Sequence, residues 1–599
     1  MEGNSQRKTG FSFARPAAAP LLLVLILLVT ASAGFAQGIT GSITGTVTDS
    51  TGSVVAGATV TVTNVATSLS RTVTTSDIGT YTVTQLLPGA YSVKIDKSGY
   101  KPYEQKNITL QIDQLAQINA QLQVGSQEQT IEVTSAAPVI QTEDSSVGLV
   151  VSSQNIQNIP LNGRLGVMGL IAIAPGVQAA GAQDQLADRG VTPSIGTGSR
   201  NAYGGMGNTL DGADNKEVTL QRSEAEVPSL DALEEFKVIT TGAPAEFNEP
   251  AQVIVVSKSG GNQLHGEALE YNRSKGTGAK TFFGGSLPRP PYERNEFGGN
   301  LAGPIFIPHL YDGKNRSFFF FAFEGFHLTQ SINDNTVQPT LAERAGYFTS
   351  LITNPTTGQP YPIATSGDYA GDYQIPSTSF SSVDTQLLTD LYPLPTTSGT
   401  GTNTFELVSN TSKATRYSIR LDHKISDKDQ IRATWLRAFY GPYPDSEADS
   451  KQGGYSGDGE HNTNTIIGWT HTFSPTVLLD TYASYFHLPI YRTPQNVNTD
   501  FASIIPGLGP VDIEGAPAIN ITNIQSVTEA GSKDLEQVEQ IGTSLTKVLA
   551  KHTVKTGISY LFDNHWNESC SRGTYSFNGQ YTGNAFADFL IGNPSSTSK

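Results

Sequence analysis

The sequence predicts a mainly β protein that is exported and contains part of a membrane β-barrel. The 599 residues include 60 glycines and 32 prolines, which favour short strands joined by many turns. Beyond an apolar stretch near the N-terminus, no apolar run reaches about 20 residues, so no transmembrane helix is expected. Several segments of about ten residues alternate apolar and polar side chains, as the strands of outer-membrane barrels do.

The first 36 residues have the pattern of a secretory signal peptide. Three cations precede an apolar stretch, namely Arg7, Lys8 and Arg15. Small residues at 31–33 and at 34–36 each offer a cleavage site. The apolar stretch is short for a membrane-spanning helix. We therefore expect residues 1–36 to direct export.

Composition excludes some classes of function. The formal net charge is −16 and no basic stripe occurs, which argues against nucleic acid as a partner. Only 15% of residues are charged, so the chain does not resemble a disordered acidic tail. The single cysteine, Cys570, cannot form a disulfide within the chain.

Residues 38–124 are expected to form a small β-sandwich. The stretch GTVTDSTGSVVAGATVTVTN alternates apolar and polar residues between turn signals, and residues 76–100 repeat this pattern. The segment resembles the carboxypeptidase regulatory-like domain, which has a transthyretin-like fold and whose name implies no peptidase activity. The residues that carry this resemblance are Gly45, Asp49, Gly52, Gly57, Asp77, Gly79, Tyr81, Gly89 and Tyr91.

Residues 125–137 form a linker with one extended stretch, Thr130, Ile131, Glu132, Val133 and Thr134. One interpretation is a last strand of the sandwich, or a tether. The other is that the stretch resembles the TonB box of TonB-dependent receptors, a mobile strand that pairs with the sheet edge of the energising protein. Glu132 departs from that pattern, because a hydrophobic residue is commoner there.

Residues 138–262 resemble the plug of TonB-dependent receptors of the Oar-like branch. The plug signature consists of Leu161, Asn162, Gly163, Arg164, Asp211 and Gly212. Pro175-Gly176, the block at 234–238 and SKSGGN at 257–262 also fit, whereas EFNEPAQ carries less glycine than the family does. Within this region, Asp231–Glu235 suits a helical turn capped by Ser229, followed by a strand at 236–239. By the resemblance, Arg164 is expected to be buried with a polar partner.

Residues 263–599 are expected to be the N-terminal part of a TonB-dependent barrel. In RYSIRLDHKI one face is apolar, with Tyr417, Ile419, Leu421 and Ile425. The other is polar, with Arg416, Ser418, Arg420, Asp422 and Lys424. A soluble sandwich could alternate in the same way, but connections that are alternately short and long are typical of barrels.

The phenylalanine-rich stretch at 317–326 divides into two faces when it is drawn as a strand. We expect Phe319, Phe321 and Phe323 to face lipid. The other face, which carries Glu324, is expected to point into the wet interior.

No catalytic residue, metal site or cofactor is expected. His565 and Glu568 have the spacing of a zinc pair, but no histidine follows them as a third ligand. No phosphate-binding loop or hydrolase nucleophile motif occurs. An Asp- and Gly-rich stretch at 445–461 lacks the order of a calcium-binding loop and is expected to be solvated.

The resemblance implies an outer-membrane receptor or transporter of the Gram-negative type, with lipid, a TonB-type protein and an unknown extracellular ligand as partners. One alternative is an adhesion or surface-interaction protein that uses the outside loops and the sandwich, which would bind carbohydrate or protein. A weaker alternative is a soluble carbohydrate-binding sandwich protein.

The sequence predicts nine barrel strands, near 264–273, 293–303, 317–328, 415–425, 430–439, 463–473, 477–487, 537–548 and 553–563. TonB-dependent barrels have 22 strands, so nine cannot close around a plug. We therefore expect an open sheet, with about 13 strands belonging to a longer protein.

Overall fold

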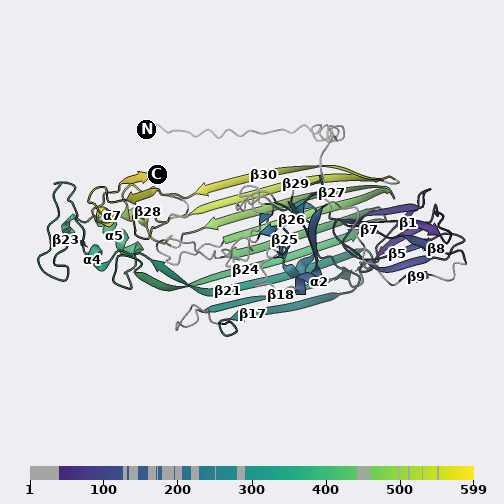
Figure 1. Ribbon diagram of the computed structural model, residues 1–599, viewed down its shortest axis with the longest axis horizontal. Helices are drawn as coiled ribbons and strands as arrows, with labels where there is room; N and C mark the ends of the chain where they lie inside the picture. Colours follow the sequence, from purple (N-terminus) through teal and green to yellow (C-terminus); the bar gives the residue numbers. More distant parts are fainter. Residues whose placement is uncertain are drawn as a thin grey trace.

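The computed structural model describes residues 39–125, 131–133, 146–158, 170–171, 173–178, 194–195, 206–216, 228–247, 249, 251–279, 291–441, 452, 459–494, 496, 498–509, 511, 513, 515–528, 531–549 and 552–598. The fold is mainly β. A small sandwich lies at one end of the long axis, a large sheet spans the middle, and a cap of short helices and loops lies at the other end (Figure 1).

The sandwich consists of two sheets that face each other across one core. One sheet holds β1 (Gly41–Asp49), β4 (Thr80–Leu86), β7 (Leu115–Gln117) and β8 (Ala120–Leu122). The other holds β2 (Thr59–Asn64), β3 (Ser70–Thr74), β5 (Gly89–Asp96) and β6 (Tyr103–Leu110). Alternate residues of β1 are buried, as its sequence pattern predicts. The sandwich thus has a continuous apolar core of its own.

Two residues of the sequence signature hold the sandwich together. The Tyr81 hydroxyl donates a hydrogen bond of 2.8 Å to the carbonyl of Ile118. At Gly45 a Cβ atom would lie 1.8 Å from that same carbonyl oxygen, so no side chain fits there.

One further strand, β9 (Ile131–Val133), extends the second sheet beyond β6. It runs parallel to β6, with Ile131 opposite Tyr103, Glu132 opposite Glu104 and Val133 opposite Gln105. The middle of the expected linker is therefore an edge strand of the sandwich.

A five-stranded sheet that is separate from the sandwich, here called the inner sheet, packs on one face of the large sheet that spans the middle of the molecule (Figure 1). In spatial order it contains β10 (Val147–Ser152), β15 (Leu233–Thr241), β16 (Ala251–Ser257), β13 (Met206–Leu210) and β14 (Ala213–Asp214). The helix α2 (Ser153–Asn158) follows β10. Leu233, Phe236 and Val253 are fully buried in its core.

The helical turn expected at Asp231–Glu235 is wrong in its position. A 3-10 turn, η2, spans Leu230–Ala232, the Ser229 side chain makes no cap hydrogen bond, and β15 begins at Leu233. Pairing with β10 and β16 and the burial of Leu233 outweigh the local helical preference.

The large sheet, here called the wall, has nine antiparallel strands. They are β17 (His265–Ser274), β18 (Tyr292–Pro304), β21 (Ser317–Thr336), β24 (Thr404–Lys424), β25 (Asp429–Gly441), β26 (Gly459–Ser474), β27 (Val477–Arg492), β29 (Ser532–Val548) and β30 (Thr553–Ser569). Each overlaps a strand predicted from the sequence. In the described part of the chain β17 and β30 do not pair with each other, so the sheet is open, as predicted.

The two faces of the wall differ in the way that the alternation predicts. Along β24, Arg416, Ser418 and Arg420 are buried, while Leu421 is exposed. The charged face therefore lies toward the inner sheet and the apolar face points outward.

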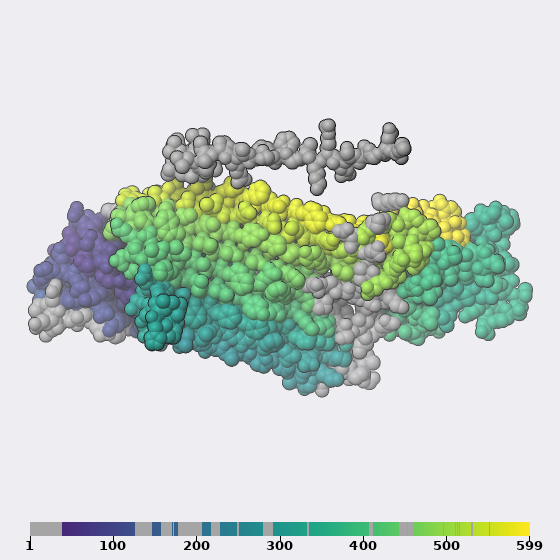
Figure 2. All heavy atoms as spheres, turned by 180° about the vertical axis from the view of Figure 1, so that it is seen from behind, coloured from purple at the N-terminus to yellow at the C-terminus, as the bar shows by residue number. Residues whose placement is uncertain are grey.

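The cap is built from three segments: two wall connections, residues 337–403 and the described part of 493–531, and the segment after β30, residues 570–598. Its helices are α4 (Leu341–Arg344), α5 (Ser382–Leu391), α6 (Phe501–Ile504) and α7 (Ala585–Leu590), with a 3-10 turn η4 (Ser377–Ser379). A sheet of β28 (Ala518–Ile521), β31 (Thr574–Phe577) and β32 (Ser596–Ser598) joins them. Figure 2 shows the teal and yellow segments gathered at this end of the molecule. They share one hydrophobic core.

Three two-stranded sheets complete the described part of the fold: β11 (Val177–Gln178) with β12 (Ser194–Ile195), β19 (Phe306–Ile307) with β20 (Tyr311–Asp312), and β22 (Tyr347–Phe348) with β23 (Tyr373–Gln374). Among the described residues, no helix has both the length and the apolar character needed to span a membrane.

Candidate functional site

The candidate site lies where the inner sheet meets the wall, and it begins at the tight turn between β13 and β14. Asp211 and Gly212 form this two-residue turn, with φ angles of 47° and 93°. Positive φ at both central positions is typical of a type I′ hairpin, for which Asp-Gly is a favoured pair. The turn places the Asp211 carboxylate between β16 and the wall, where only 1% of the residue is exposed.

Asp211 is surrounded by donors from both sheets. Its Oδ1 accepts from the Ser257 amide at 3.0 Å and from Arg420 Nη1 at 3.3 Å. Its Oδ2 accepts from Ser257 Oγ at 2.5 Å and from Thr434 Oγ1 at 2.6 Å. A buried carboxylate with this number of donors is fully compensated for the loss of water.

Arg420 joins this carboxylate to a second one. Its Nε and Nη2 donate to the two oxygens of Asp422 at 3.0 and 3.1 Å, and Nη1 also donates to the Ser257 carbonyl at 2.7 Å. Ser259 Oγ closes the network on Asp422 Oδ2 at 2.6 Å. We call Asp211, Ser257, Ser259, Arg420, Asp422 and Thr434 the latch. It ties the inner sheet to β24 and β25 through charges that are removed from water.

Further contacts extend the interface on either side of the latch. Asn464 donates to Asn215 at 2.9 Å, and the Asp214 amide donates to Gln540 at 3.1 Å. Leu436, Ile466 and Tyr482 of the wall belong to the hydrophobic core of the inner sheet. The inner sheet is thus bound to the wall by polar and apolar contacts together.

The sandwich docks against the inner sheet through residues 112 and 113. The Ile112 amide donates to Glu235 Oε2 at 2.7 Å, and Lys237 Nζ lies 2.9 Å from Asp113 Oδ2. Burial at this interface raises the pKa of the Glu235 carboxyl to about 7. An apolar cluster lies beside these contacts, formed by Ile39, Ile112, Ile239, Phe247, Ile254 and Val256.

Asn262 connects the sandwich to the edge of the wall. Its amide donates to the Ala66 carbonyl at 2.9 Å, and its side chain donates to Asn315 at 2.7 Å. Asn262 ends the SKSGGN stretch whose first residue, Ser257, belongs to the latch. This stretch therefore touches the inner sheet, the wall and the sandwich.

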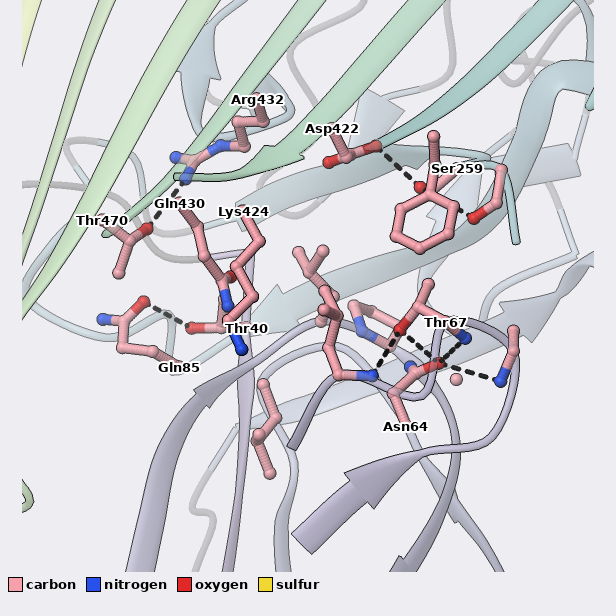
Figure 3. Close-up of a pocket in the computed structure, with 18 of the residues that line it drawn as sticks. Thr40, Asn64, Thr67, Gln85, Ser259, Asp422, Lys424, Gln430, Arg432 and Thr470 are labelled. Atoms are coloured by element: carbon pink, nitrogen blue, oxygen red, sulfur yellow. Dashed lines mark hydrogen bonds between the residues drawn. The ribbon is translucent and has the colours of Figure 1, made fainter. Parts of the chain in front are cut away.

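A cavity of about 230 Å³ lies where these three bodies meet (Figure 3). Asn64, Thr67 and Gln85 line it from the sandwich, and Asp422, Lys424 and Arg432 line it from the wall. Most of these polar groups already have partners: Asn64 accepts from Thr67, and Arg432 forms a two-pronged ion pair with Asp480 at 2.9 and 3.0 Å.

The predicted site residues have different outcomes. Asp211 belongs to the latch and Gly212 follows it in the same turn, whereas Leu161, Asn162, Gly163 and Arg164 lie outside the described residues. Of the TonB-box-like stretch, Ile131, Glu132 and Val133 form β9, and Thr130 and Thr134 also lie outside the described part of the chain. Phe321 is exposed and Phe319 and Phe323 are half-buried, while Phe318 and Phe320 are buried. Contact of the first three with lipid stays a prediction.

The latch could not be recognised as a network from the sequence. Arg420 and Asp422 lie on the predicted polar face of a strand, and Ser257 and Ser259 belong to a block that fits the family. Thr434 carried no signal, because one threonine in a wall strand looks like any other. A charged pair two residues apart on the buried face of a strand was the signal that could have indicated a buried partner.

The described residues contain no group of three or more His, Cys, Asp or Glu side chains that could hold a metal ion. His565 and Glu568 lie three apart on β30, where they point to opposite faces. Glu568 is instead 3.9 Å from Lys533.

Comparison with known proteins identifies relatives of this arrangement. The chain is 26% identical over 302 residues to the TonB-dependent transporter Oar of Myxococcus xanthus, which covers 47% of this chain and 27% of that protein. The chain thus spans about a quarter of the length of this curated relative.

Solved structures with a similar arrangement include the outer membrane transporter YddB from Escherichia coli, with 11% identity and a TM-score of 0.41 over 72% of this chain and 50% of that one. The siderophore receptor PirA from Acinetobacter baumannii has 14% identity and a TM-score of 0.38, over 70% and 48% of the two chains. Likenesses this weak carry no argument about function.

Two domain families match directly. Residues 42–123 match the carboxypeptidase regulatory-like domain, which coincides with the sandwich. Residues 256–599 match the outer membrane beta barrel domain; the match begins near the end of β16 and includes the whole wall and the cap. This match covers more than half of the chain and places the protein in the outer membrane. The chain therefore belongs to the outer membrane beta barrel domain family.

Proposed function

We propose that the protein is a TonB-dependent receptor that takes up a ligand across the outer membrane, with energy supplied by a TonB-type protein, and that it is not an enzyme. In this proposal the inner sheet is the plug, the wall is part of the barrel, and the stretch at 130–134 is the TonB box. Similarity to the transporter Oar supports this class.

The observation that carries the proposal is the latch between Asp211 and Arg420. A plug must be held firmly until a pull moves it, and a buried ion pair with matched hydrogen bonds meets this need. Breaking such a pair costs about 3–5 kcal/mol when one partner is left alone in the interior. The pull of an energising protein would supply work of this kind.

The position of β9 supports the proposal that the stretch at 130–134 is the TonB box. β9 lies at the end of a sheet, with β6 on one side and no other strand beside it among the described residues. An edge strand can pair with a strand of another protein. It also lies on the sandwich, at the end of the wall opposite the cap, where the wall turns are short (Figure 1). In a barrel that end faces the periplasm.

Binding of the purified periplasmic domain of the host's TonB-type protein tests the proposal. The full chain in lipid nanodiscs should bind this domain, and Ile131→Pro with Val133→Pro should abolish binding, because proline removes the backbone donors that a strand needs. Gln127→Pro, outside the stretch, is the matched control. Binding that survives both prolines would show that residues 130–134 are not a TonB box.

A second candidate is a surface-interaction protein that transports nothing. The cap favours it, because a connection with its own hydrophobic core can present a fixed binding surface. Cells that lack the TonB-type protein separate the two candidates. A receptor that transports would lose ligand accumulation in these cells, whereas an adhesion protein would keep its full surface binding.

A further inference from the structure

The cap contains a cavity that neither the latch nor the barrel accounts for. It lies between α5, α7 and β31 and has a volume of about 240 Å³. Its apolar lining is formed by Val383, Leu387, Ile505, Ile519, Phe577 and Phe589. These residues come from all three segments that build the cap, so the cavity exists only when the cap is assembled.

The volume limits the size of an occupant. An apolar cavity of about 150 Å³ holds benzene, and pockets for drug-sized molecules start at about 300 Å³. The cap cavity lies between these values. It suits a molecule of one or two fused rings.

One charged side chain, Asp384, lines this apolar cavity. Only 8% of the residue is exposed, and no cation lies within ion-pairing distance of its carboxylate in the described part of the chain. Burial raises the pKa of this carboxyl to about 6, with Ser381 as its hydrogen-bond partner. A buried anion without a cation is costly, and a cationic ligand would relieve that cost.

Gly592 leaves space next to the carboxylate. A Cβ atom at this position would lie 3.1 Å from Asp384 Oδ2 and 2.9 Å from the Ser381 side chain. Gly592 also has a φ of 74°, a backbone angle that residues other than glycine rarely adopt. A side chain here would crowd Oδ2 of Asp384, and both Gly592 and Asp384 line the cavity.

Asp384 also lies in the first turn of α5, where a carboxylate stabilises a helix. That role requires neither a cavity next to the carboxylate nor a glycine packed beside it. An acid that serves only the helix would be better solvated at an exposed position of the same turn.

We propose that the cap cavity binds a small aromatic or aliphatic ring compound that carries an amine, with its ammonium paired to Asp384. The rings fill the apolar part of the cavity, and the ammonium donates to the Asp384 carboxylate. This proposal does not depend on transport, because a receptor and a surface-interaction protein could both use such a site.

The full chain in lipid nanodiscs, titrated with three probes of the same shape, tests the proposal. The probes are 1-naphthylmethylamine, the neutral 1-naphthalenemethanol and the anionic 1-naphthoate. At about pH 8 the amine should bind roughly tenfold tighter than the alcohol, since hydrogen bonds to charged groups contribute more than neutral ones. Naphthoate should bind most weakly. At about pH 5, Asp384 takes up its proton and the advantage of the amine should disappear.

Two variants locate the site. Asp384→Asn should remove the preference for the amine and keep binding of the alcohol, while Asp390→Asn, on the same helix but outside the cavity, should change neither. Val383→Phe should fill the cavity and weaken both probes. Thermal unfolding of each variant checks that the cap is folded. The pH dependence of amine binding to the unaltered protein tests the pairing with Asp384 without any substitution.

Absence of binding by all three probes would overturn the site. Equal binding of amine and alcohol at about pH 8 would overturn the assignment of an amine. Binding that is unchanged in Val383→Phe would place the probes elsewhere on the protein and would also contradict the proposal.

Discussion

Arg420 Nη1 lies 3.3 Å from Asp211 Oδ1, although the two residues are 209 positions apart in the sequence. Only 2% of Arg420 and 1% of Asp211 are exposed, so this contact is made away from water. Arg420 is held by Asp422 of its own strand, and Asp211 is held by Ser257 of the neighbouring strand. Each charge therefore keeps partners within its own sheet, which suits two bodies that separate and meet again.

Arg420→Ala should destabilise the contact between the inner sheet and the wall by about 3–5 kcal/mol, because it leaves Asp211 buried without its cation. Hydrogen exchange of the β13 and β14 amides measures this, since these strands carry the Asp211 turn. Arg316→Ala removes an exposed arginine at the rim of the same sheet and should have little effect.

The double replacement Asp211→Asn with Arg420→Met should cost less than the sum of the two single replacements, because it leaves no charge at position 211 to miss its cation. Asp422 loses Arg420 in both Arg420 variants and keeps its hydrogen bond from Ser259. If the β13 and β14 amides exchanged no faster in Arg420→Ala than in Arg316→Ala, the latch would not be what holds the inner sheet.

Docking of the sandwich should weaken as the pH rises. The docked Glu235 carboxyl has its pKa raised to about 7 by burial, from an ordinary value of 4.5. Between these values the docked state binds the additional proton, so the docked state is favoured at low pH and loses this advantage as the pH passes about 7. The loss is of the order of 1–3 kcal/mol.

The protection factor of the Ile112 amide, which donates to Glu235, measures this effect between pH values of about 5 and about 8. Glu235→Gln keeps an acceptor for Ile112 and should remove the pH dependence. Glu104→Gln, on β6 and outside the interface, is the control and should leave the slope unchanged. A slope that is the same in Glu235→Gln would assign the pH dependence to another group.

The wall could be predicted from the sequence because its signal is local. Each strand alternates between a lipid-type and an interior-type side chain, and this pattern is readable without knowing the partner strand, as in RYSIRLDHKI. The Asp-Gly turn was readable for the same reason. The partner of Asp211 was not, because Arg420 is one of several cations on interior-facing strand positions and only the assembled sheets select it.

The cap was not predicted as a folded unit, since its core is assembled from three distant segments. Each contributes helices or strands of ten residues or fewer, too short for a clear period. Some local signals were present. Ser381 and Asn584 are N-caps, and Leu387 with Leu391, like Phe586 with Leu590, shows the four-residue spacing of a buried helix face.

The sandwich, residues 38–124, should unfold cooperatively when it is produced alone. Its core is closed by its own strands and it has no metal or disulfide to lose. In this fragment Tyr81→Phe should cost about 1 kcal/mol, because the buried Ile118 carbonyl loses its donor. Denaturant titration measures both, with Tyr100→Phe as the control at a half-buried tyrosine. A fragment without a cooperative transition would show that the sandwich depends on the inner sheet.

A disulfide between β6 and β9 distinguishes the two edges of β9 with which the TonB-type protein could pair. Glu104 and Glu132 are opposite each other in the parallel pair, and Glu104→Cys with Glu132→Cys leaves Ile131 and Val133 unchanged. The native Cys570 is buried and should not interfere. In the oxidised variant β9 cannot leave the sandwich, so binding of the periplasmic domain should fall if that domain must take over the β6 side of the strand. Reductant should restore binding, and each single cysteine variant should bind normally.

Full binding by the oxidised variant would mean that the partner adds to the outer edge of β9 while the strand stays on the sandwich. Ile131→Pro would still abolish binding in that case, which separates the route of engagement from the identity of the box.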